Sequence, residues 1–401
     1  MAQYKKKKCQ TLIVMGCLVQ RYYQELKQAL PEVDLWIPIK EYDTLWEQIE
    51  TILEKQKSKI AKQEIKNNKK QENKIINTYQ MDPMPMLTQE EYLGRVLSTG
   101  PITAYLKIGE GCSNRCTYCA IPAIRGPFVS RKMEDILEEA KKLAEKGIQE
   151  LIVIAQDTTK YGIDLYGESK LAELLEKLCQ IQGLHWIRFL YSYPETITDK
   201  LIQVVKKQEK ICKYFDIPIQ HVSNPVLKRM NRKSDQTSIE KLMQKLRKEI
   251  PDVVIRTTLI VGFPGETKQD FERLENFVKQ QKFDKLGAFS YSKEEGTPAA
   301  KLKEQIHPMT KKARYNQIMK IQQEVSKEKM KEKIGKTVEV LIENKTFDGK
   351  YYVGRTKQDV PDIDGLVYIK IEKENQNLIH QFVWCKVEDV REYDLIAKII
   401  E

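Results

Sequence analysis

The sequence predicts an α/β protein of three parts: an incomplete N-terminal α/β domain, a central parallel sheet with helices outside it, and a small C-terminal antiparallel β-barrel. Six short apolar runs alternate with amphipathic runs between Thr103 and Lys331, as in a series of β/α units. Five β-rich runs separated by turn residues follow between Gly335 and Glu401. The length of 401 residues also exceeds one ordinary domain.

The N-terminal part, residues 1–53, predicts a strand at Thr11–Met15, a turn at Gly16 and an amphipathic helix. A second short strand and another helix follow Pro31. Two short strands bury little helix surface, so this part is interpreted as a piece of an α/β domain. Residues 54–97 are predicted to be a polar linker, because eight Lys stand against three Glu between Glu54 and Lys74. Such a composition is typical of a solvated linker or an exposed helix.

The central part, residues 98–332, contains the six predicted strands: AYLKI, ELIVIAQ, WIRFLY, YFDIPI, VVIRTTLIVG and KLGAFSY. Helix-like stretches such as MEDILEEAKKLAEKG follow most of them, which predicts a parallel sheet, either open or curled into an incomplete barrel. Ligands of such sheets bind at the carboxyl ends of the strands. The loop after the first strand, Gly109–Gly126, is therefore expected at the mouth of a site.

The C-terminal part, residues 333–401, contains the runs KTVEVLIE, KYYVGR, GLVYIKI, FVWCKV and YDLIAKII. Turn signals separate these runs, including Asp348 followed by Gly349. Short strands joined by tight turns predict a small antiparallel barrel.

Charge and cysteine content limit the function classes. The formal net charge of +11 favours contact with RNA or a ribonucleoprotein. Eight cysteines are too few for a secreted disulfide scaffold of this length, and their clustering indicates metal or catalytic use in a reducing setting. No apolar run approaches the roughly 20 residues of a membrane span, so a cytoplasmic protein without membrane association is expected. The alternative, an export signal at Lys5–Val19, conflicts with that reducing setting, and a buried strand explains the same residues.

The loop Gly109–Gly126 contains three cysteines, Cys112, Cys116 and Cys119, without a fourth nearby. Structural zinc sites and the iron–sulfur cubes of electron carriers usually have four protein ligands. Three thiolates would leave one iron of a 4Fe–4S cube open to a substrate; the alternative is a zinc site with a distant fourth ligand. Three other cysteines fall in apolar patterns typical of buried free thiols: Cys179, Cys212 and Cys385.

The CxxxCxxC spacing, placed after the first strand of a β/α domain, resembles the radical S-adenosylmethionine (SAM) enzymes. The resemblance implies a partial (β/α)6 barrel and a 4Fe–4S cluster whose open iron binds SAM. It also implies that reduction of the cluster splits SAM to a 5′-deoxyadenosyl radical, which abstracts hydrogen from carbon. Tyr118, just before the third cysteine, matches the aromatic residue that the family places beside the SAM adenine. Three arginines near the loop could hold cluster charge or steer an acidic partner: Arg115, Arg125 and Arg131.

The run EGCSNRCTYCAIPAIRGPFVSR, followed by AQDTTKYGID, resembles the methylthiotransferases. Those enzymes join an N-terminal domain carrying a second cluster to a radical SAM domain and a C-terminal β-barrel called TRAM. The segments WIRFLYSYPETIT, DIPIQHVSNPVLKRMNR and FSYSKEEGTPAA are similar to the branch that modifies the β-carbon of an aspartate in small-subunit ribosomal protein twelve. The other branch methylthiolates adenosine in tRNA and typically has Asn where this chain has Asp157.

The resemblance therefore implies ribosomal protein twelve, free or in the ribosome, as the partner, with tRNA as the alternative substrate. A second SAM molecule would supply the methyl group, and flavodoxin or ferredoxin would supply electrons. The resemblance also assigns six residues to SAM binding: Gln156, Asp157, Thr158, Gln220, Arg256 and Gly262. Their structural alternatives are strand-end polar groups that bond buried backbone and an ordinary turn glycine.

Cys17, in VMGCLVQRY, matches the third of three cysteines that hold the auxiliary cluster in the family. The segments with the first two have no counterpart after Met1, and Cys9 has no matching segment. The auxiliary 4Fe–4S cluster is therefore in doubt for this chain as written. Two hypotheses stay open: an enzyme that completes sulfur insertion, and a shortened form that binds ribosomes or RNA without completing a turnover.

Overall fold

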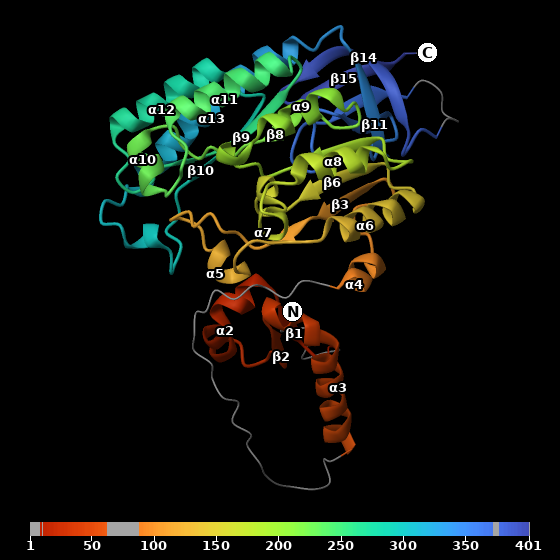
Figure 1. The fold of residues 1–401 in the computed structure, drawn as a ribbon, viewed down its shortest axis with the longest axis vertical. Coiled ribbons are helices and arrows are strands. Elements are labelled where there is room, and N and C mark those ends of the chain that lie inside the picture. Colours follow the sequence, from red (N-terminus) through yellow and green to blue (C-terminus); the bar gives the residue numbers. More distant parts are fainter. Residues whose placement is uncertain (1–8, 10, 62–87, 372–376, 401) are drawn as a thin grey trace. The chain divides into compact units, whose positions relative to one another are not determined.

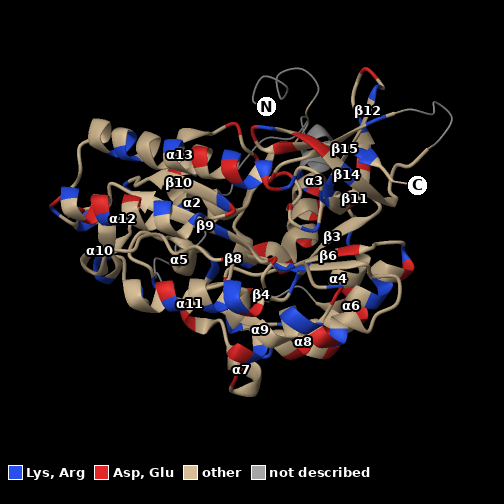
Figure 2. Ribbon diagram, turned by 90° about the horizontal axis from the view of Figure 1, so that it is seen from above, with Lys and Arg blue, Asp and Glu red and all other residues tan. Residues whose placement is uncertain are grey.

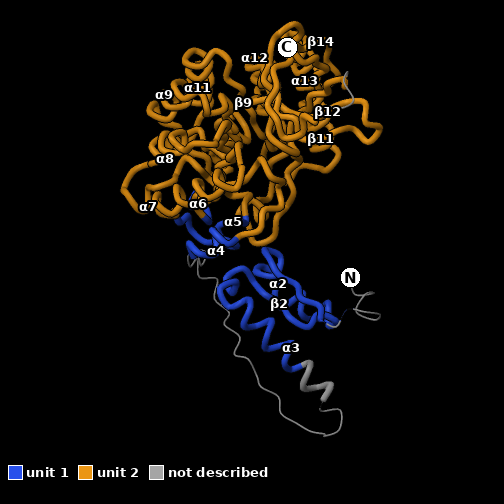
Figure 3. The backbone as a smooth tube through the Cα atoms, turned by 90° about the vertical axis from the view of Figure 1, so that its right-hand side faces the viewer, with its two compact units in different colours: residues 1–94, 110–114, 120–129 blue, residues 95–109, 115–119, 130–401 orange. Residues whose placement is uncertain are grey.

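The computed structural model describes residues 9, 11–61, 88–371 and 377–400 (Figure 1). Residues 62–87 of the predicted linker and the Lys5–Lys8 part of the alternative export signal lie outside the described residues. The chain divides into two compact units (Figure 3). Unit 1 comprises residues 1–94, 110–114 and 120–129, and unit 2 comprises residues 95–109, 115–119 and 130–401. The predicted boundaries at residues 53, 97 and 332 stay a prediction.

Unit 1 has the predicted order of strand, helix, strand and helix in its N-terminal part. Strands β1 and β2 pair in parallel, with Val14 opposite Trp36. The bounds are β1 Ile13–Met15, α2 Cys17–Ala29, β2 Leu35–Ile37, η1 Ile39–Thr44, α3 Leu45–Ala61, α4 Gln89–Gly94 and α5 Ile121–Arg125. Helix α3 thus continues into residues predicted as linker, because Lys, Gln, Glu and Ala are all good helix formers.

The six predicted central strands are all present in unit 2, and every pair is parallel. The order is β3-β6-β7 in one sheet and β8-β9-β10 in the next. A single parallel bridge, Ile187 to Ile211, joins the edge of the first sheet to the chain that enters β8. The bounds are β3 Thr103–Lys107, β6 Glu150–Ile154, β7 Trp186–Phe189, β8 Tyr214–Asp216, β9 Val254–Val261 and β10 Lys285–Ser290.

Amphipathic helices cover the outer side of these strands (Figure 1). Neighbouring helices contact one another: α6 with α8, α8 with α9, α9 with α11, and α12 with α13. The longer helices are α6 Met133–Glu145, α8 Leu171–Cys179, α9 Asp199–Lys207, α11 Gln236–Glu249, α12 Lys268–Gln281 and α13 Pro308–Lys331. The short elements are β4 Gly109–Glu110, β5 Val129–Ser130, η2 Thr158–Lys160, α7 Ile163–Tyr166, η3 Pro194–Thr196, α10 Asn224–Arg229 and η4 Pro298–Lys301. Among the described helices, none combines the length and the apolar content that a bilayer crossing needs.

The C-terminal strands close into a barrel in the order β11-β12-β13-β15-β14. Four strand pairs are antiparallel, as predicted, but β13 and β15 pair in parallel. A ring of five strands cannot alternate direction all the way round, so one parallel pair is a geometric necessity. The bounds are β11 Thr337–Lys345, β12 Tyr351–Thr356, β13 Val367–Lys370, β14 Phe382–Arg391 and β15 Asp394–Ile399.

The barrel packs against the amino ends of the central strands within unit 2. Leu341 and Val360 from the barrel share one buried cluster with Trp186, Tyr214 and Val254, which begin or lie near the start of their strands. The loop with Cys116 and Cys119 follows the opposite, carboxyl end of β3. The barrel therefore leaves the carboxyl ends of the strands uncovered.

A buried ion cluster ties the barrel to the sheet. Arg355 of β12 donates from Nη1 and Nη2 to Glu150 at the start of β6, and from Nε to Glu343 at 2.8 Å. Arg188 of β7 approaches the same Glu150 carboxylate at 3.3 Å. The side chains of Arg355, Arg188 and Glu150 are each at most 1% exposed. Burial raises the pKa of Glu150, but Arg355 and Arg188 lower it by more, so the net shift is downward.

We expect Arg355→Met to destabilise the protein by about 3 to 5 kcal/mol, because it leaves a buried carboxylate short of donors. Urea unfolding of the purified chain measures this loss. Lys142→Ala serves as the control, since its ion pair with Glu138 is exposed on both sides and is worth about 1 kcal/mol or less. Equal unfolding midpoints for Arg355→Met and the parent would contradict the role given to this cluster.

Candidate active site

Residues 115–119 of the cysteine loop are held by backbone contacts within unit 2. Thr117 donates from its backbone N to the Met230 carbonyl at 3.1 Å, and Ala299 donates to the Thr117 carbonyl at 2.9 Å. The Thr117 hydroxyl also donates to the Arg229 carbonyl at 2.8 Å. The end of α10 and the start of η4 therefore fix this part of the loop from two directions.

Cys116 lies against a tyrosine and an arginine. Its Sγ is 2.9 Å from the Tyr193 hydroxyl, and only 5% of the residue is exposed. The Arg232 guanidinium lies over the Tyr193 ring at 4.0 Å. Burial, and next the charge of Cys116, raises the pKa of Tyr193, so this phenol stays protonated.

Arg232 is buried with donors to spare. Its Nη2 donates to the Pro218 carbonyl at 2.9 Å, and its Nε lies 3.9 Å from Glu195 Oε1 in an ion pair. Nε and Nη1 have no hydrogen-bond partner among the described residues. Burial lowers its pKa, but Tyr118, Tyr193 and Glu195 raise it by more, so the guanidinium stays charged. A buried cation with unused donors suits an anionic group beside Cys116.

Tyr118 faces the segment that follows β9. Its ring meets the Phe263 ring edge-to-face, with centroids 6.4 Å apart. Burial, and next the charge of Cys116, raises its pKa well above the usual value. Tyr118 thus contributes a flat aromatic surface between the loop and the Gly262–Gly265 turn.

Unit 1 contains Cys112 and Arg125, one of the three arginines noted near the loop. Cys112 is 8% exposed and its backbone N donates to the Gly126 carbonyl at 3.0 Å. Arg125, at the end of α5, lies 3.2 Å from Glu110 Oε2 and donates from Nη2 to Cys17 Sγ at 3.2 Å. Burial lowers the pKa of Arg125, but Glu110 and Cys17 raise it by more. Cys17 is exposed at the first residue of α2.

The three loop cysteines suit a metal cluster by donor chemistry rather than by a preformed cage. Within the described part of the chain, no group of three or more His, Cys, Asp or Glu side chains is gathered closely enough to hold a metal ion. Metal binding couples to the final arrangement of its ligands, so the type of donor atom matters more here than a preformed cage. Three thiols in eight residues, with a buried guanidinium over the tyrosine ring that contacts one of them, fit an anionic iron–sulfur cluster.

Two of the predicted SAM contacts after β6 are engaged locally. Asp157 Oδ1 accepts from the Thr159 backbone N at 3.2 Å and from its hydroxyl at 2.5 Å, so it caps η2. The Thr158 hydroxyl donates to the Leu190 carbonyl at 2.7 Å. Gln156, directly before them, is partly exposed. Asp157 and Thr158 therefore shape the turn at the end of β6.

The other predicted contacts follow β8 or lie in and after β9. Gln220 has a left-handed backbone (φ 68°), and its Oε1 is buried without a partner in the described residues. Arg256 is 2.9 Å from Asp216 Oδ1, so it is paired across β8 and β9. Gly262 has φ 70°, and a Cβ there would lie 2.4 Å from Lys311 Cγ.

From the sequence, no site role was predicted for Tyr193, Arg232, Ser192 or His221. Ser192 Oγ and His221 Nε2 are fully buried and lack hydrogen-bond partners among the described residues. Ser192 and Tyr193 follow β7, His221 follows β8, and Arg232 follows α10. The available signal was polar residues just after predicted strands, in YSYP and QHVS.

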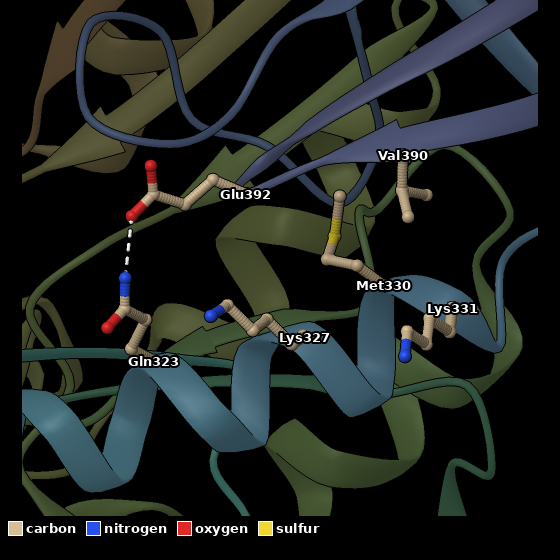
Figure 4. A pocket seen from close by; sticks show the side chains of 6 residues that line it. All are labelled: Gln323, Lys327, Met330, Lys331, Val390 and Glu392. Carbon is tan, nitrogen blue, oxygen red and sulfur yellow. Dashed lines mark hydrogen bonds between the residues drawn. The ribbon is translucent and has the colours of Figure 1, made fainter.

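A separate surface cavity of about 350 Å³ lies between α13 and the β14–β15 hairpin (Figure 4). Gln323 donates to Glu392 across it at 2.9 Å. None of the predicted site residues lines it, so this cavity is separate from the site at the cysteine loop. Its lining residues are Gln323, Lys327, Met330, Lys331, Val390 and Glu392.

Known proteins match this chain along almost its full length. Residues 106–278 match the radical SAM superfamily, and residues 334–400 match the TRAM domain. The chain is 55% identical to the ribosomal protein uS12 methylthiotransferase RimO of Alkaliphilus oremlandii, over 100% of this chain and 85% of that protein. It is 49% identical to the protein of the same name from Clostridioides difficile, over 97% of this chain and 82% of that one.

Matches among solved structures include two radical SAM enzymes. The cobalamin-dependent enzyme OxsB is 14% identical with a TM-score of 0.45, over 79% of this chain and 43% of that chain. Coproporphyrinogen III oxidase HemN from Escherichia coli is 16% identical with a TM-score of 0.42, over 67% of this chain and 69% of that chain.

We expect Gly262→Ala to cost about 1 to 2 kcal/mol of stability, because its left-handed backbone disfavours a side chain and the new Cβ would push Lys311. Urea unfolding checks this. Gly287→Ala is the matched control, since a Cβ there meets nothing within 4 Å and needs no left-handed backbone. Equal losses at the two positions would contradict the tight turn after β9.

Proposed function

The chain belongs to the radical SAM methylthiotransferases that act on ribosomal protein uS12, the RimO family, and on that basis we propose how its own residues serve the reaction. The observation that carries this function is 55% identity over the whole chain to a RimO enzyme. The protein is a transferase that uses a 4Fe–4S cluster and SAM. We propose the β-carbon of an aspartate in uS12 as the atom that receives the methylthio group, with a second SAM as the methyl source.

Cys112, Cys116 and Cys119 would hold the cluster. When bound, the reduced cluster and SAM together supply a carbon-centred radical able to remove hydrogen from unactivated carbon. The role of the protein is to bind, orient and exclude water around that chemistry. Arg232 supports this ligand set, because its buried positive charge and two unused donors lie beside the Tyr193 ring that contacts Cys116.

SAM would bind along the carboxyl ends of the strands. Gln220 supports this proposal through its buried Oε1. Gly262 would contact SAM through its backbone, because Lys311 fills the space where a side chain would lie. The Tyr118 ring gives a flat surface for an adenine. Gln156 and Arg256 complete the proposed contacts, whereas Asp157 and Thr158 would act by shaping the turn after β6.

Cys17 keeps the position of an auxiliary-cluster ligand. Within residues 9 and 11–61, its one companion is Cys9, whose Sγ donates to the Thr11 carbonyl at 3.1 Å. Cys9 and Cys17 lie on either side of β1, and two thiols do not fit a second 4Fe–4S cluster that needs three cysteine ligands. No step of the reaction is therefore assigned to an auxiliary cluster on these residues.

The partners are proposed from chemistry and family. Flavodoxin or ferredoxin would deliver electrons, and the enzyme would work in the cytoplasm, where ribosomes are made. Lys and Arg alternate with Asp and Glu along the outer helices (Figure 2), so charge alone does not choose between uS12 and tRNA. The relatives named above are uS12 enzymes, and no feature of the site favours tRNA.

We expect Cys116→Ala to abolish reductive cleavage of SAM, because a cube held by two thiolates is not retained. The loss should exceed the roughly 100-fold that removal of an outer-shell partner costs a metal site. Anaerobic assays of 5′-deoxyadenosine and of bound iron measure it. Cys179→Ala is the control, since burial raises the pKa of that thiol to about 11 and it lies on α8, outside the loop. Undiminished 5′-deoxyadenosine formation by Cys116→Ala would refute the ligand assignment.

The substrate is tested in a bacterial strain that lacks methylthiotransferase activity. After expression of this chain, mass spectrometry is expected to find a methylthio group on uS12 and none on tRNA adenosine. Anaerobic reconstitution adds a second readout, because one cube corresponds to about four irons and two cubes to about eight. SAM cleavage with about four irons and unmodified uS12 would instead favour a protein that binds ribosomes or RNA and cleaves SAM without inserting sulfur.

A further inference from the structure

Tyr193 is held in place by its neighbours in unit 2. It follows β7 and precedes Pro194, the first residue of η3. Its backbone N donates to Thr159 Oγ1 at 3.3 Å, and its carbonyl accepts from the Thr196 backbone N at 3.1 Å. A residue before proline is restricted to extended backbone, and Tyr193 has φ −74° and ψ 130°. The backbone that carries this side chain is therefore well determined.

The ring of Tyr193 is also fixed. Arg232 covers it at 4.0 Å and is itself tied to the Pro218 carbonyl. Ser234, two residues further on, donates from its backbone N and its hydroxyl to Glu195 Oε1 at 2.9 and 2.7 Å. These contacts clamp the segment after β7 to the segment after α10. The phenol is thereby directed at Cys116 Sγ, 2.9 Å away.

The direction of this hydrogen bond follows from the chemistry of a ligating cysteine. A thiolate bound to iron has no proton to donate, so the Tyr193 hydroxyl must be the donor and the sulfur the acceptor. Hydrogen bonds to the sulfurs tune the reduction potentials of iron–sulfur clusters. An added electron makes the cluster more negative and the bond stronger, so the bond favours the reduced state.

We propose that Tyr193 is a positioning residue that donates a hydrogen bond to the Cys116 sulfur of the bound cluster and thereby makes that cluster easier to reduce. This inference rests on the proposed ligand role of Cys116. Arg232 supports the same effect, because it places a buried positive charge against the donor ring. The electron itself comes from an external low-potential donor, and Tyr193 neither gains nor loses one.

The test is the midpoint potential of the cluster in Tyr193→Phe, which keeps the ring under Arg232 and removes the hydroxyl alone. Anaerobic titration with dithionite, followed by electron paramagnetic resonance, measures it. We expect one-electron reduction to become about tenfold less favourable, a shift of about 59 mV to more negative potential. SAM cleavage should slow in the same variant when the donor is weak and recover when a stronger reductant is supplied.

Tyr191→Phe is the matched control. Tyr191 lies in the same segment, is 44% exposed, and loses the same hydroxyl on substitution. The midpoint potential of the cluster in Tyr191→Phe should equal that of the cluster in the parent protein. An unshifted potential in Tyr193→Phe, or an equal shift in both variants, would overturn the inference.

Two further outcomes separate the inference from the function on which it rests. Absence of a 4Fe–4S signal in the parent, or its persistence in Cys116→Ala, would overturn the proposed ligand set and the inference with it. Loss of the cluster in Tyr193→Phe alone, while Tyr191→Phe and the parent keep theirs, would show that Tyr193 is needed for assembly. That result would refute a tuning role and leave the proposed function intact.

Discussion

Parallel pairing of the six central strands is the constraint on which the site depends. Because all six run the same way, the residues after β6, β7, β8 and β9 come together at one edge although they are distant in sequence. The loop with Cys116 and Cys119 follows β3 at that edge. Thr117 then fixes the loop to the end of α10 and to η4 through backbone hydrogen bonds that any residue except proline could make.

The polar cluster around Glu150 at the amino ends of the strands differs from the polar groups near the cysteine loop at the carboxyl ends. At the amino ends, Glu150 accepts from Arg188, Arg355 and Thr103, so the buried carboxylate is fully bonded and joins the barrel to the sheet. At the carboxyl ends, Gln220 and Arg232 keep buried atoms without hydrogen-bond partners in the described residues, although Arg232 is ion-paired with Glu195 at 3.9 Å. Buried polar atoms without hydrogen-bond partners next to the cysteine loop suit a bound ligand.

Several differences from expectation have simple physical causes. The barrel contains one parallel pair, β13 with β15, because five strands cannot alternate around a closed ring. Helix α3 extends to Ala61, into the segment whose composition predicted either a solvated linker or an exposed helix, because linker-like composition and helix propensity overlap in Lys, Glu and Gln. Arg125, noted only as one of three basic residues near the loop, is paired with Glu110 and Cys17. Spacing along the chain carries no information about such pairs.

The sequence alone determined the six central strands, the barrel strands and the three-cysteine loop, because apolar periodicity and the CxxxCxxC spacing are local patterns that can be identified within one segment of the chain. It also determined the family, through segments such as EGCSNRCTYCAIPAIRGPFVSR. Only the tertiary structure decided that Tyr193 contacts Cys116 under Arg232, that Arg256 is paired with Asp216, and that Arg355 closes the ion cluster on Glu150. Those contacts join residues far apart in the chain, and their distances are set by how helices and strands pack rather than by any pattern that a single segment displays.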